Sequence, residues 1–227
     1  METSTKDRLY SDLIEACTKT GCPLCRVSLA FVRSYLDNTM YEHINDPDVR
    51  ADLRDARGYC NTHAWMLTER HGVVLGMAII QRDLLNAVLE AIDVAPLGRG
   101  VRQYTRNILQ RLRPSAECPA CVHRRTMEDI AIQTLLKYLN DARLATALDE
   151  TSGLCLPHFS RALELAQDSE QLERLLSFQR RVLERLCDEL SELIRKHNYC
   201  FQDEEIGQEG DSWLRALGIT SAERKVR

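Results

Sequence analysis

Four short motifs carry the residues of this chain that most directly suggest a metal site. Two have the form C-P-x-C, at residues 22–25 and 118–121, and two have the form G-x-C-x-x-H, at residues 58–63 and 153–158. Thiolate sulfur and imidazole nitrogen are preferred ligands of Zn²⁺, and structural zinc sites commonly combine three cysteines with one histidine. Two residues between ligands allow both side chains of a motif to reach one ion. One motif of each form therefore completes a tetrahedral Cys3His site.

The motifs occur in the same order in both halves of the chain, which predicts an internal duplication. Residues 45–63 align with residues 140–158 at an offset of 95, and the C-P-x-C motifs align at an offset of 96. Matched order and context are typical of a repeat. Because an ancestral half had to fold with its own ligands, we expect each half to hold one ion. The expected tetrads are Cys22, Cys25, Cys60 and His63, and Cys118, Cys121, Cys155 and His158.

Three other interpretations of these side chains stay open. The eight residues could pack as small core residues, although C-P-x-C is a turn motif and not one face of a helix. C-P-x-C also resembles the active-site sequence of glutaredoxin-like thiol–disulfide oxidoreductases, but there it follows a β-strand, and no strand pattern precedes either motif here. Three cysteines and a histidine can also bind an iron–sulfur cluster. The expected cofactors are therefore two zinc ions or, alternatively, two iron–sulfur clusters.

The elements that must position these motifs are helices. Apolar residues recur at helical spacing on both sides of each C-P-x-C motif, and no stretch shows the sustained alternation of a strand. Asp46-Pro47 pairs a capping side chain with proline at the first helical position, which predicts a helix start. Long final helices are expected over residues 73–92 and 170–197. The sequence thus predicts an all-α protein of two pseudo-symmetric helical halves, each with one Cys3His metal site.

The boundary between the halves is expected in the segment DVAPLGRG, residues 93–100. Its proline and two glycines suit a linker. We expect a first metal-binding repeat over residues 1–95, a second over residues 96–200, and a C-terminal tail over residues 201–227.

The tail is expected to contain a short amphipathic helix. Asp211 is placed to cap it, Trp213, Leu214 and Leu217 lie on its apolar side, and Gly218 is expected to end it. This pattern favours a helix folded onto the core, with a detachable partner-binding helix as the alternative.

A basic segment opens the second half. Residues 99–113 include five arginines and no acid. Such a face is most often solvated surface, and its functional alternative is binding of an anionic partner. The candidate anion-binding residues share one helical face: Arg99, Arg102, Arg106 and Arg113.

The remaining cysteines are not expected to bind metal. Cys17 aligns with Leu112 and Cys187 aligns with Ile92, so both are predicted to pack as small apolar residues. Cys200 lies outside the repeated pattern and receives no role.

Composition narrows the class of protein. The 227 residues carry 30 basic and 34 acidic side chains, and the formal net charge of −4 argues against a general nucleic-acid binder. The N-terminal residues lack the apolar core of a secretory signal, and the most apolar run, residues 73–80, is too short to span a bilayer. Nine cysteines without an export signal indicate the reducing cytoplasm, where clustered cysteines more often bind metal than form disulfides.

The sequence carries no recognisable catalytic signature, so it leans against an enzyme. Both predicted metal sites are filled by four protein ligands, which is typical of structural sites. The predicted function is a non-catalytic zinc-binding helical protein that acts as an interaction or regulatory module, with a protein partner that the sequence does not name. The alternatives are an iron–sulfur redox or sensing protein and a CxxC thiol–disulfide oxidoreductase. The oligomeric state is left open.

Nearly the whole chain resembles a bacterial family known as domain of unknown function 6062. The shared segments are CPLC, YLDNTMYEHINDPDVR, GYCNTHAWML, CPAC, SGLCLPHFSRALELA and RKHNYCFQDEEIGQEGDSWLRAL. The resemblance implies a soluble bacterial protein and brings no established activity. The metal-site prediction therefore rests on the residues themselves.

Overall fold

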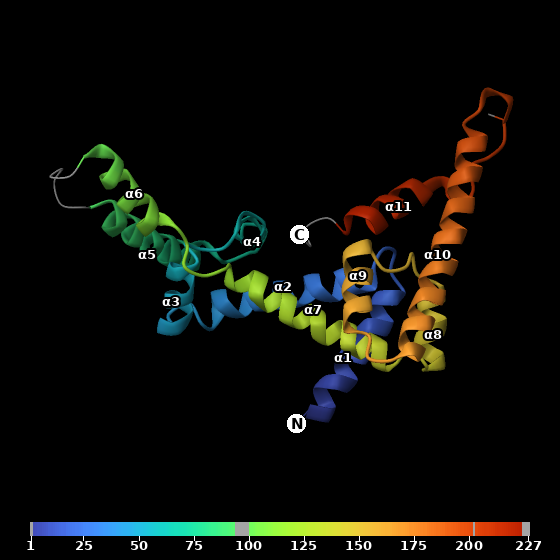
Figure 1. Ribbon diagram of the computed structural model, residues 1–227, viewed down its shortest axis with the longest axis horizontal. Helices are drawn as coiled ribbons and strands as arrows, with labels where there is room; N and C mark the ends of the chain where they lie inside the picture. Colours follow the sequence, from blue (N-terminus) through green and yellow to red (C-terminus); the bar gives the residue numbers. More distant parts are fainter. Residues whose placement is uncertain (1, 94–99, 202, 224–227) are drawn as a thin grey trace. The chain divides into compact units, whose positions relative to one another are not determined.

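The computed structural model describes residues 2–93, 100–201 and 203–223, and every regular element among them is a helix (Figure 1). The predicted all-α fold is confirmed. The α-helices are α1 (Glu2–Cys17), α2 (Pro23–Tyr41), α3 (Pro47–Asp55), α4 (Asn61–Leu67), α5 (Val74–Ile92), α6 (Val101–Leu112), α7 (Pro119–Lys137), α8 (Ala142–Asp149), α9 (Leu156–Leu165), α10 (Ser169–Lys196) and α11 (Ser212–Ser221). Two 3₁₀ turns, η1 (Tyr199–Phe201) and η2 (Gln208–Asp211), precede α11.

Helix α3 begins where the sequence predicts. The Asp46 carboxylate accepts hydrogen bonds from the backbone N–H groups of Asp48 (2.9 Å) and Val49 (3.4 Å), and Pro47 occupies the first helical position. Asp141 caps α8 in the same way. These caps satisfy donors that the first turn of a helix leaves unpaired, so they fix both helix starts.

The two long helices α5 and α10 also lie within one residue of their predicted bounds. Both turn the same aligned positions toward the interior. At the offset of 95, the buried residues Ile80, Leu84 and Ala91 of α5 correspond to the buried residues Leu175, Gln179 and Leu186 of α10.

The chain folds into two compact units, and each unit takes segments from both halves of the sequence. Unit 1 consists of Met1–Ala30 and Thr126–Arg227, and unit 2 consists of Phe31–Arg125. Helices α2 and α7 each pass from one unit into the other. This division differs from the expected boundaries at residues 95 and 200. Most of the expected linker, residues 94–99, lies outside the described residues.

The helix lengths explain why the chain does not divide at its midpoint. Helix α2 has 19 residues and rises about 28 Å, whereas α3 has nine residues and rises only about 14 Å. A hairpin built from helices alone would need a second helix of similar length to return the C-x-x-H motif to the start of α2. In the second half, α7 and α8 have 19 and 8 residues and differ in the same way.

In unit 1, elements from the two ends of the chain share one core. Helix α1 packs against α8, where the Tyr10 hydroxyl donates to the Asp141 carboxylate at 2.6 Å. Leu13 of α1 and Leu144 of α8 are fully buried. Helix α10 also packs against α8, and α11 packs against both α9 and α10 (Figure 1).

In unit 2, helix α5 is the central element because both α3 and α6 pack against it. The Asp83 carboxylate of α5 pairs with Arg50 (3.2 Å) and Arg54 (2.8 Å) of α3. The segment after α6 is tied to the end of α3 by a hydrogen bond from the Ser115 N–H to the Asp55 carbonyl (2.8 Å).

The tail forms the expected helix, but its buried side differs from the prediction. Helix α11 continues past Gly218 to Ser221, and it packs through Ser212 and Ile219. The three residues predicted to face the core are between 51% and 55% exposed: Trp213, Leu214 and Leu217. A small serine permits a closer approach of the helix to its neighbours than a tryptophan, which explains why hydrophobicity alone identified the wrong side.

The tail is also held by a charged pair. Lys196, the last residue of α10, donates to the Glu209 carboxylate of η2 at 2.7 Å. The Glu209 carboxylate accepts a further hydrogen bond from the Gly207 N–H at 2.9 Å.

The basic segment is helical only in part. Arg102 and Arg106 are exposed on α6, whereas Arg113 is the extended residue that ends this helix. Arg99 lies outside the described residues. The structure thus places two of the four candidate anion-binding arginines within the helix.

Candidate metal centres

The structure brings the eight predicted ligands together in two clusters that could each hold a metal ion. Within each cluster, the sulfur and nitrogen atoms all lie within 4.8 Å of one another. Site 1, in unit 1, consists of Cys22, Cys25, Cys155 and His158; site 2, in unit 2, consists of Cys60, His63, Cys118 and Cys121.

The pairing of the motifs corrects the prediction. Each half was expected to complete its own tetrad, but each site combines the C-P-x-C motif of one half with the C-x-x-H motif of the other. The cause is the crossing of α2 and α7 between the units. Each of these helices starts at a C-P-x-C motif in one unit and carries the chain into the other unit, where the following C-x-x-H motif lies.

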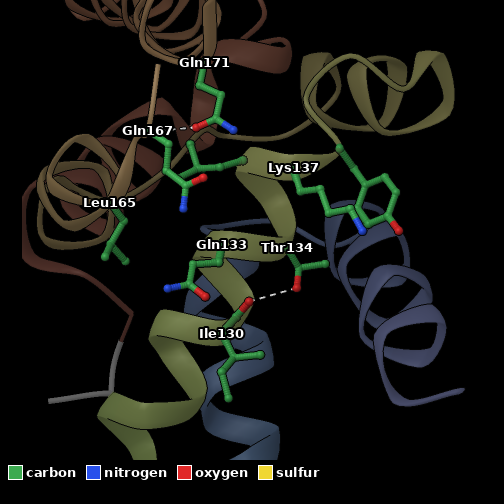
Figure 2. A pocket seen from close by; sticks show the side chains of 9 residues that line it. Ile130, Gln133, Thr134, Lys137, Leu165, Gln167 and Gln171 are labelled. Atoms are coloured by element: carbon green, nitrogen blue, oxygen red, sulfur yellow. Dashed lines mark hydrogen bonds between the residues drawn. The ribbon is translucent and has the colours of Figure 1, made fainter. Parts of the chain in front are cut away.

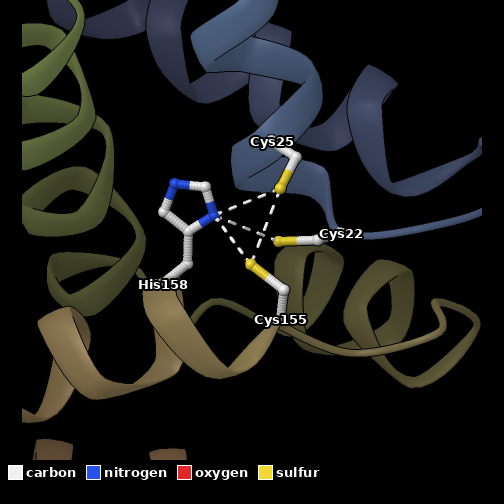
Figure 3. A group of neighbouring side chains, drawn as sticks. All are labelled: Cys22, Cys25, Cys155 and His158. Carbon is white, nitrogen blue, oxygen red and sulfur yellow. Dashed lines mark hydrogen bonds between the residues drawn. The ribbon is translucent and has the colours of Figure 1, made fainter. Parts of the chain in front are cut away.

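In site 1, the ring nitrogen of His158 faces three sulfur atoms (Figure 3). The distances from His158 Nδ1 are 3.1 Å to Cys155 Sγ, 3.4 Å to Cys25 Sγ and 3.6 Å to Cys22 Sγ. The sulfur atoms of Cys25 and Cys155 are 3.6 Å apart.

Site 2 repeats this arrangement. The distances from His63 Nδ1 are 3.3 Å to Cys60 Sγ, 3.4 Å to Cys121 Sγ and 3.5 Å to Cys118 Sγ. The sulfur atoms of Cys60 and Cys121 are 3.7 Å apart.

These separations match the edges of a zinc tetrahedron. With Zn–S bonds of about 2.3 Å and Zn–N bonds of about 2.0–2.1 Å, tetrahedral geometry places two sulfur ligands about 3.8 Å apart and a sulfur and a nitrogen about 3.5 Å apart. The observed sulfur–sulfur distances are 3.6 and 3.7 Å, and the sulfur–nitrogen distances run from 3.1 to 3.6 Å. The donor set and the spacing both fit a single four-coordinate ion in each site.

Similarity to known proteins gives the chain a family. A model for a family of unknown function, DUF6062, matches residues 11–226. The chain belongs to the DUF6062 family. A relative from Caldicellulosiruptor sp. (strain Rt8B.4), described as an uncharacterized 23.9 kDa protein in the xynA 3′ region, is 25% identical over 188 residues, which cover 82% of this chain and 87% of the relative. No solved structure matches the chain.

In this DUF6062 protein, helix starts position both motifs of site 1. Pro23 begins α2 between the two cysteines of its motif, and Cys155 is the capping residue of α9, with His158 in the first turn. Free N–H groups and the helix dipole favour negative charge at these starts, so they stabilise thiolates. The residue two positions before Cys155 is Gly153, with φ +84°; a Cβ there would lie 2.8 Å from a Val182 methyl group, so both conformation and space require glycine.

Burial makes the thiolate forms of Cys22 and Cys121 unfavourable without a cation, whereas hydrogen bonds, chiefly from Cys22 and Cys25, hold the pKa of Cys155 well below its usual value. The cysteines of site 1 are at most 3% exposed, and burial, followed by the neighbouring cysteines, raises the pKa of the Cys22 thiol well above its usual value. In site 2, burial and the neighbouring thiols raise the pKa of Cys121 to about 12. Buried thiols of this kind stay protonated unless a cation stabilises the thiolate form. Binding of a divalent ion reverses this preference.

A carboxylate that the sequence motifs did not reveal supports His158. Glu128 of α7 places its Oε1 atom 3.2 Å from His158 Nε2, and the same oxygen accepts a hydrogen bond from the Ser28 hydroxyl at 2.8 Å. A carboxylate on the second ring nitrogen is the usual partner of a metal-bound histidine, because it leaves Nδ1 free of a proton and fixes the ring orientation. Glu128 lies 30 residues from His158, so motif spacing gives no signal for it.

Site 2 has a different outer environment. At the offset of 96, Glu128 corresponds to Val32 and Ser28 corresponds to Arg124. Burial, followed by the Arg124 charge, lowers the pKa of His63, which favours the neutral ring that binds metal. Cys60 and Cys121 are partly exposed, in contrast to the buried cysteines of site 1. The two sites therefore have the same types of ligand, three cysteines and one histidine, but differ in the charge of their surroundings and in their accessibility.

A pocket in unit 1 holds none of the predicted site residues. Its volume is about 270 Å³, and it is lined by neutral side chains together with one cation, Lys137 (Figure 2). Thr134 donates to the Ile130 carbonyl at 2.8 Å, and the Gln171 side chain accepts from the Gln167 N–H at 2.9 Å. Polar groups at this pocket thus already bond to the protein itself.

The three cysteines outside the clusters differ in burial. Cys17 is 3% exposed, which confirms its predicted packing. Cys187 is exposed, so its predicted burial is wrong: its position on α10 faces away from the buried stripe of that helix. Cys200 is also exposed.

Proposed function

We propose that this DUF6062 protein binds two zinc ions, one in each cluster, and acts as a non-catalytic interaction or regulatory module. The observation that carries the proposal is the pair of clusters, each with three sulfur atoms and one nitrogen at tetrahedral-edge distances. Four protein ligands complete the coordination of Zn²⁺ and leave no position for water or substrate, which is typical of a structural site. In this role, site 1 holds helices from both ends of the sequence in unit 1, and site 2 joins segments within unit 2.

The spacing favours single ions over iron–sulfur clusters. In a cluster, ligands on different irons are separated further by the iron–iron spacing, so they are more widely spaced than ligands that share one ion. All four ligand atoms of each site lie within 4.8 Å of one another, which suits a shared ion. Zinc is preferred among single ions because thiolate and imidazole ligands in tetrahedral geometry suit it.

Thiol–disulfide exchange is less well supported. An attacking cysteine must be accessible and have a lowered pKa. Cys22 and Cys25 are 3% and 0% exposed, and the pKa of Cys22 is raised, chiefly by burial. A redox role at this motif would require the unit to open.

We also propose a cytoplasmic location and a protein partner. None of the nine cysteines is paired in a disulfide, and a reducing compartment preserves that state. In the described part of the chain, no helix has both the length and the apolar character that crossing a membrane requires. The net charge of −4 disfavours nucleic acid as the partner.

Metal analysis combined with a visible spectrum tests the proposal. Protein purified without oxygen should contain two zinc ions per chain and be colourless. Visible absorption together with iron would favour the iron–sulfur alternative. A folded protein that contains no metal after purification without chelators would overturn the proposal.

A further inference from the structure

Helix α5 is apolar on two opposite faces, and the residues that the structure describes cover only one of them. Ile80, Leu84 and Ala91 face the interior of unit 2 and are at most 9% exposed. A helix that is apolar all round is normally buried all round. The second face of α5 is therefore the feature that needs an explanation.

The second face carries a regular stripe, which we call the α5 stripe. Its residues are spaced alternately three and four apart, as in a coiled-coil seam, and all are exposed: Leu75, Ala78, Arg82, Leu85, Leu89 and Ile92. The four large apolar members are between 45% and 73% exposed. This stripe has the pattern of a helix that packs against another helix.

The aligned helix α10 shows that the fold does not require an apolar stripe at these positions. At the offset of 95, the α5 stripe corresponds to Glu170, Glu173, Ser177, Arg180, Glu184 and Cys187. Both helices bury the same aligned positions on the inner face, but α10 is largely polar on the outer face. The apolar outer face of α5 thus has a role specific to unit 2.

We propose that the α5 stripe is the interface of a homodimer, in which α5 packs antiparallel to α5 of a second copy around a two-fold axis. A two-fold axis places the same surface patch on both sides, so the patch must be complementary to itself. With the axis between Leu85 and Leu89, each of these leucines lies opposite the other in the second copy. The next stripe residues outward from this pair, Arg82 and Ile92, then lie opposite each other, whereas Leu75 and Ala78 lie beyond the end of α5 of the second copy.

The charges near the stripe favour this occupant. The same antiparallel register places Arg82 opposite Ile92 of the second copy, beside its Asp93. Asp93 ends α5, where the negative end of the helix dipole also attracts a cation. Two such contacts form across the axis, so the only charged residue of the stripe meets an opposite charge.

The area that this register can bury lies in the lower range of specific interfaces. Leu85, Leu89 and Ile92 face the second copy, and helix α6, which packs beside α5 (Figure 1), also exposes Val101 and Leu109. With on the order of 100 Å² for each of these five side chains, the register offers roughly 500 Å² per chain, or about 1,000 Å² for the pair, which is about the minimum for a biological interface.

Sedimentation velocity across micromolar protein concentrations tests the dimer. The wild-type protein should sediment with twice the chain mass of 26.0 kDa. Leu85→Glu with Leu89→Glu should raise the dimer dissociation constant at least about 100-fold, because each change buries a charge at the centre of the interface. The matched control is Leu214→Glu with Leu217→Glu on α11, whose side chains are exposed to a similar degree and which should leave the dimer intact.

A charge exchange tests the register. Arg82→Asp alone and Asp93→Arg alone should each weaken the dimer about tenfold, and the combined variant should restore it. These residues are 11 positions apart on one helix, too far to pair within a chain, so rescue must act between copies. If the double glutamate variant loses the circular dichroism signal of its helices, it has unfolded. The charge-exchange variants alone then test the dimer.

Several outcomes would overturn the proposal. They are a wild-type monomer at every concentration, a dimer that survives the double glutamate change, equal loss of the dimer in the α11 control, and failure of the combined charge variant to recover. Metal content is measured on the same samples, because a monomer with two zinc ions refutes the dimer and leaves the metal proposal standing.

Discussion

The crossed pairing of the motifs can be tested by counting metal ions in paired variants. Cys25→Ser combined with Cys155→Ser changes two ligands that share site 1 but come from different halves of the sequence. Cys25→Ser combined with Cys60→Ser changes two ligands of the same half that belong to different sites. The first pair should retain one metal ion per chain, and the second should retain none.

The expected loss of affinity is large enough to give whole-number results. Structural zinc binds with an apparent free energy of about 10–16 kcal/mol, so one ligand of four accounts for roughly 3–4 kcal/mol. At about 1.4 kcal/mol per factor of ten, removal of one ligand weakens a site several-hundred-fold. A chelator of intermediate affinity therefore strips a site with one serine and leaves an intact site loaded. A second substitution in a site that is already empty removes no further ion.

The assay is metal analysis after equilibration with this chelator, with each single variant as a control. Both single variants should retain one ion, which shows that the other site is intact. The opposite pattern, with no ion in the Cys25 and Cys155 variant and one ion in the Cys25 and Cys60 variant, would refute the crossed pairing. It would restore the arrangement in which each half completes its own site.

Three further predictions follow from the surroundings of the sites and the tail. Glu128→Gln should weaken metal binding at site 1 by about 10–100-fold, because the His158 ring loses its orienting carboxylate. The control Asp129→Asn, which changes the neighbouring acid, should leave metal binding unchanged. Competition with a chelator measures the metal affinity of both variants. Because Cys60 and Cys121 are partly exposed, a chelator should empty site 2 first, and alkylation followed by mass spectrometry should label site 2 cysteines before those of site 1. Hydrogen bonds from the Lys196 side chain and from backbone N–H groups hold the pKa of the Glu209 carboxyl at about 2, below its usual 4.5. This carboxylate therefore stabilises the fold above pH 4.5 and loses that effect as the pH falls toward 2. Glu209→Gln should therefore lower the melting temperature at neutral pH, and the difference from wild type should shrink across that acidic range.

The helices and the eight candidate ligands could be predicted from the sequence because the signals for them are local. A capping aspartate followed by proline fixes the start of α3 within one turn, and C-x-x-C or C-x-x-H spacing is set by the geometry of a single helix start. The offset of 95 also relates the positions that α5 and α10 bury, although the structure was needed to identify them. Each of these inferences needs only residues a few positions apart, or a comparison of equivalent positions.

The pairing of the motifs could not be predicted in the same way. Both halves have the same motifs, so each C-P-x-C motif is chemically complementary to either C-x-x-H motif. The choice between them depends on whether the chain between the motifs turns back, and this depends on the unequal lengths of α2 and α3. Glu128 was missed for a related reason, since it meets His158 only once α7 has crossed into unit 1.

The crossed arrangement makes the two units differ in what they require to fold. Site 2 joins residues 55–61 positions apart within a contiguous unit, whereas site 1 joins residues 130–136 positions apart, from segments near both ends of the chain. Closing the longer loop of site 1 costs less than about 1 kcal/mol more, in lost chain entropy, than closing the loop of site 2. This difference is small beside the apparent binding free energy of about 10–16 kcal/mol for a structural zinc ion. Loop length therefore does not set the order of assembly. The order of the segments along the chain sets it instead. Unit 2 has its whole sequence and its four ligands once residue 125 is synthesised, whereas unit 1 must wait for α8, α9 and α10 to join α1.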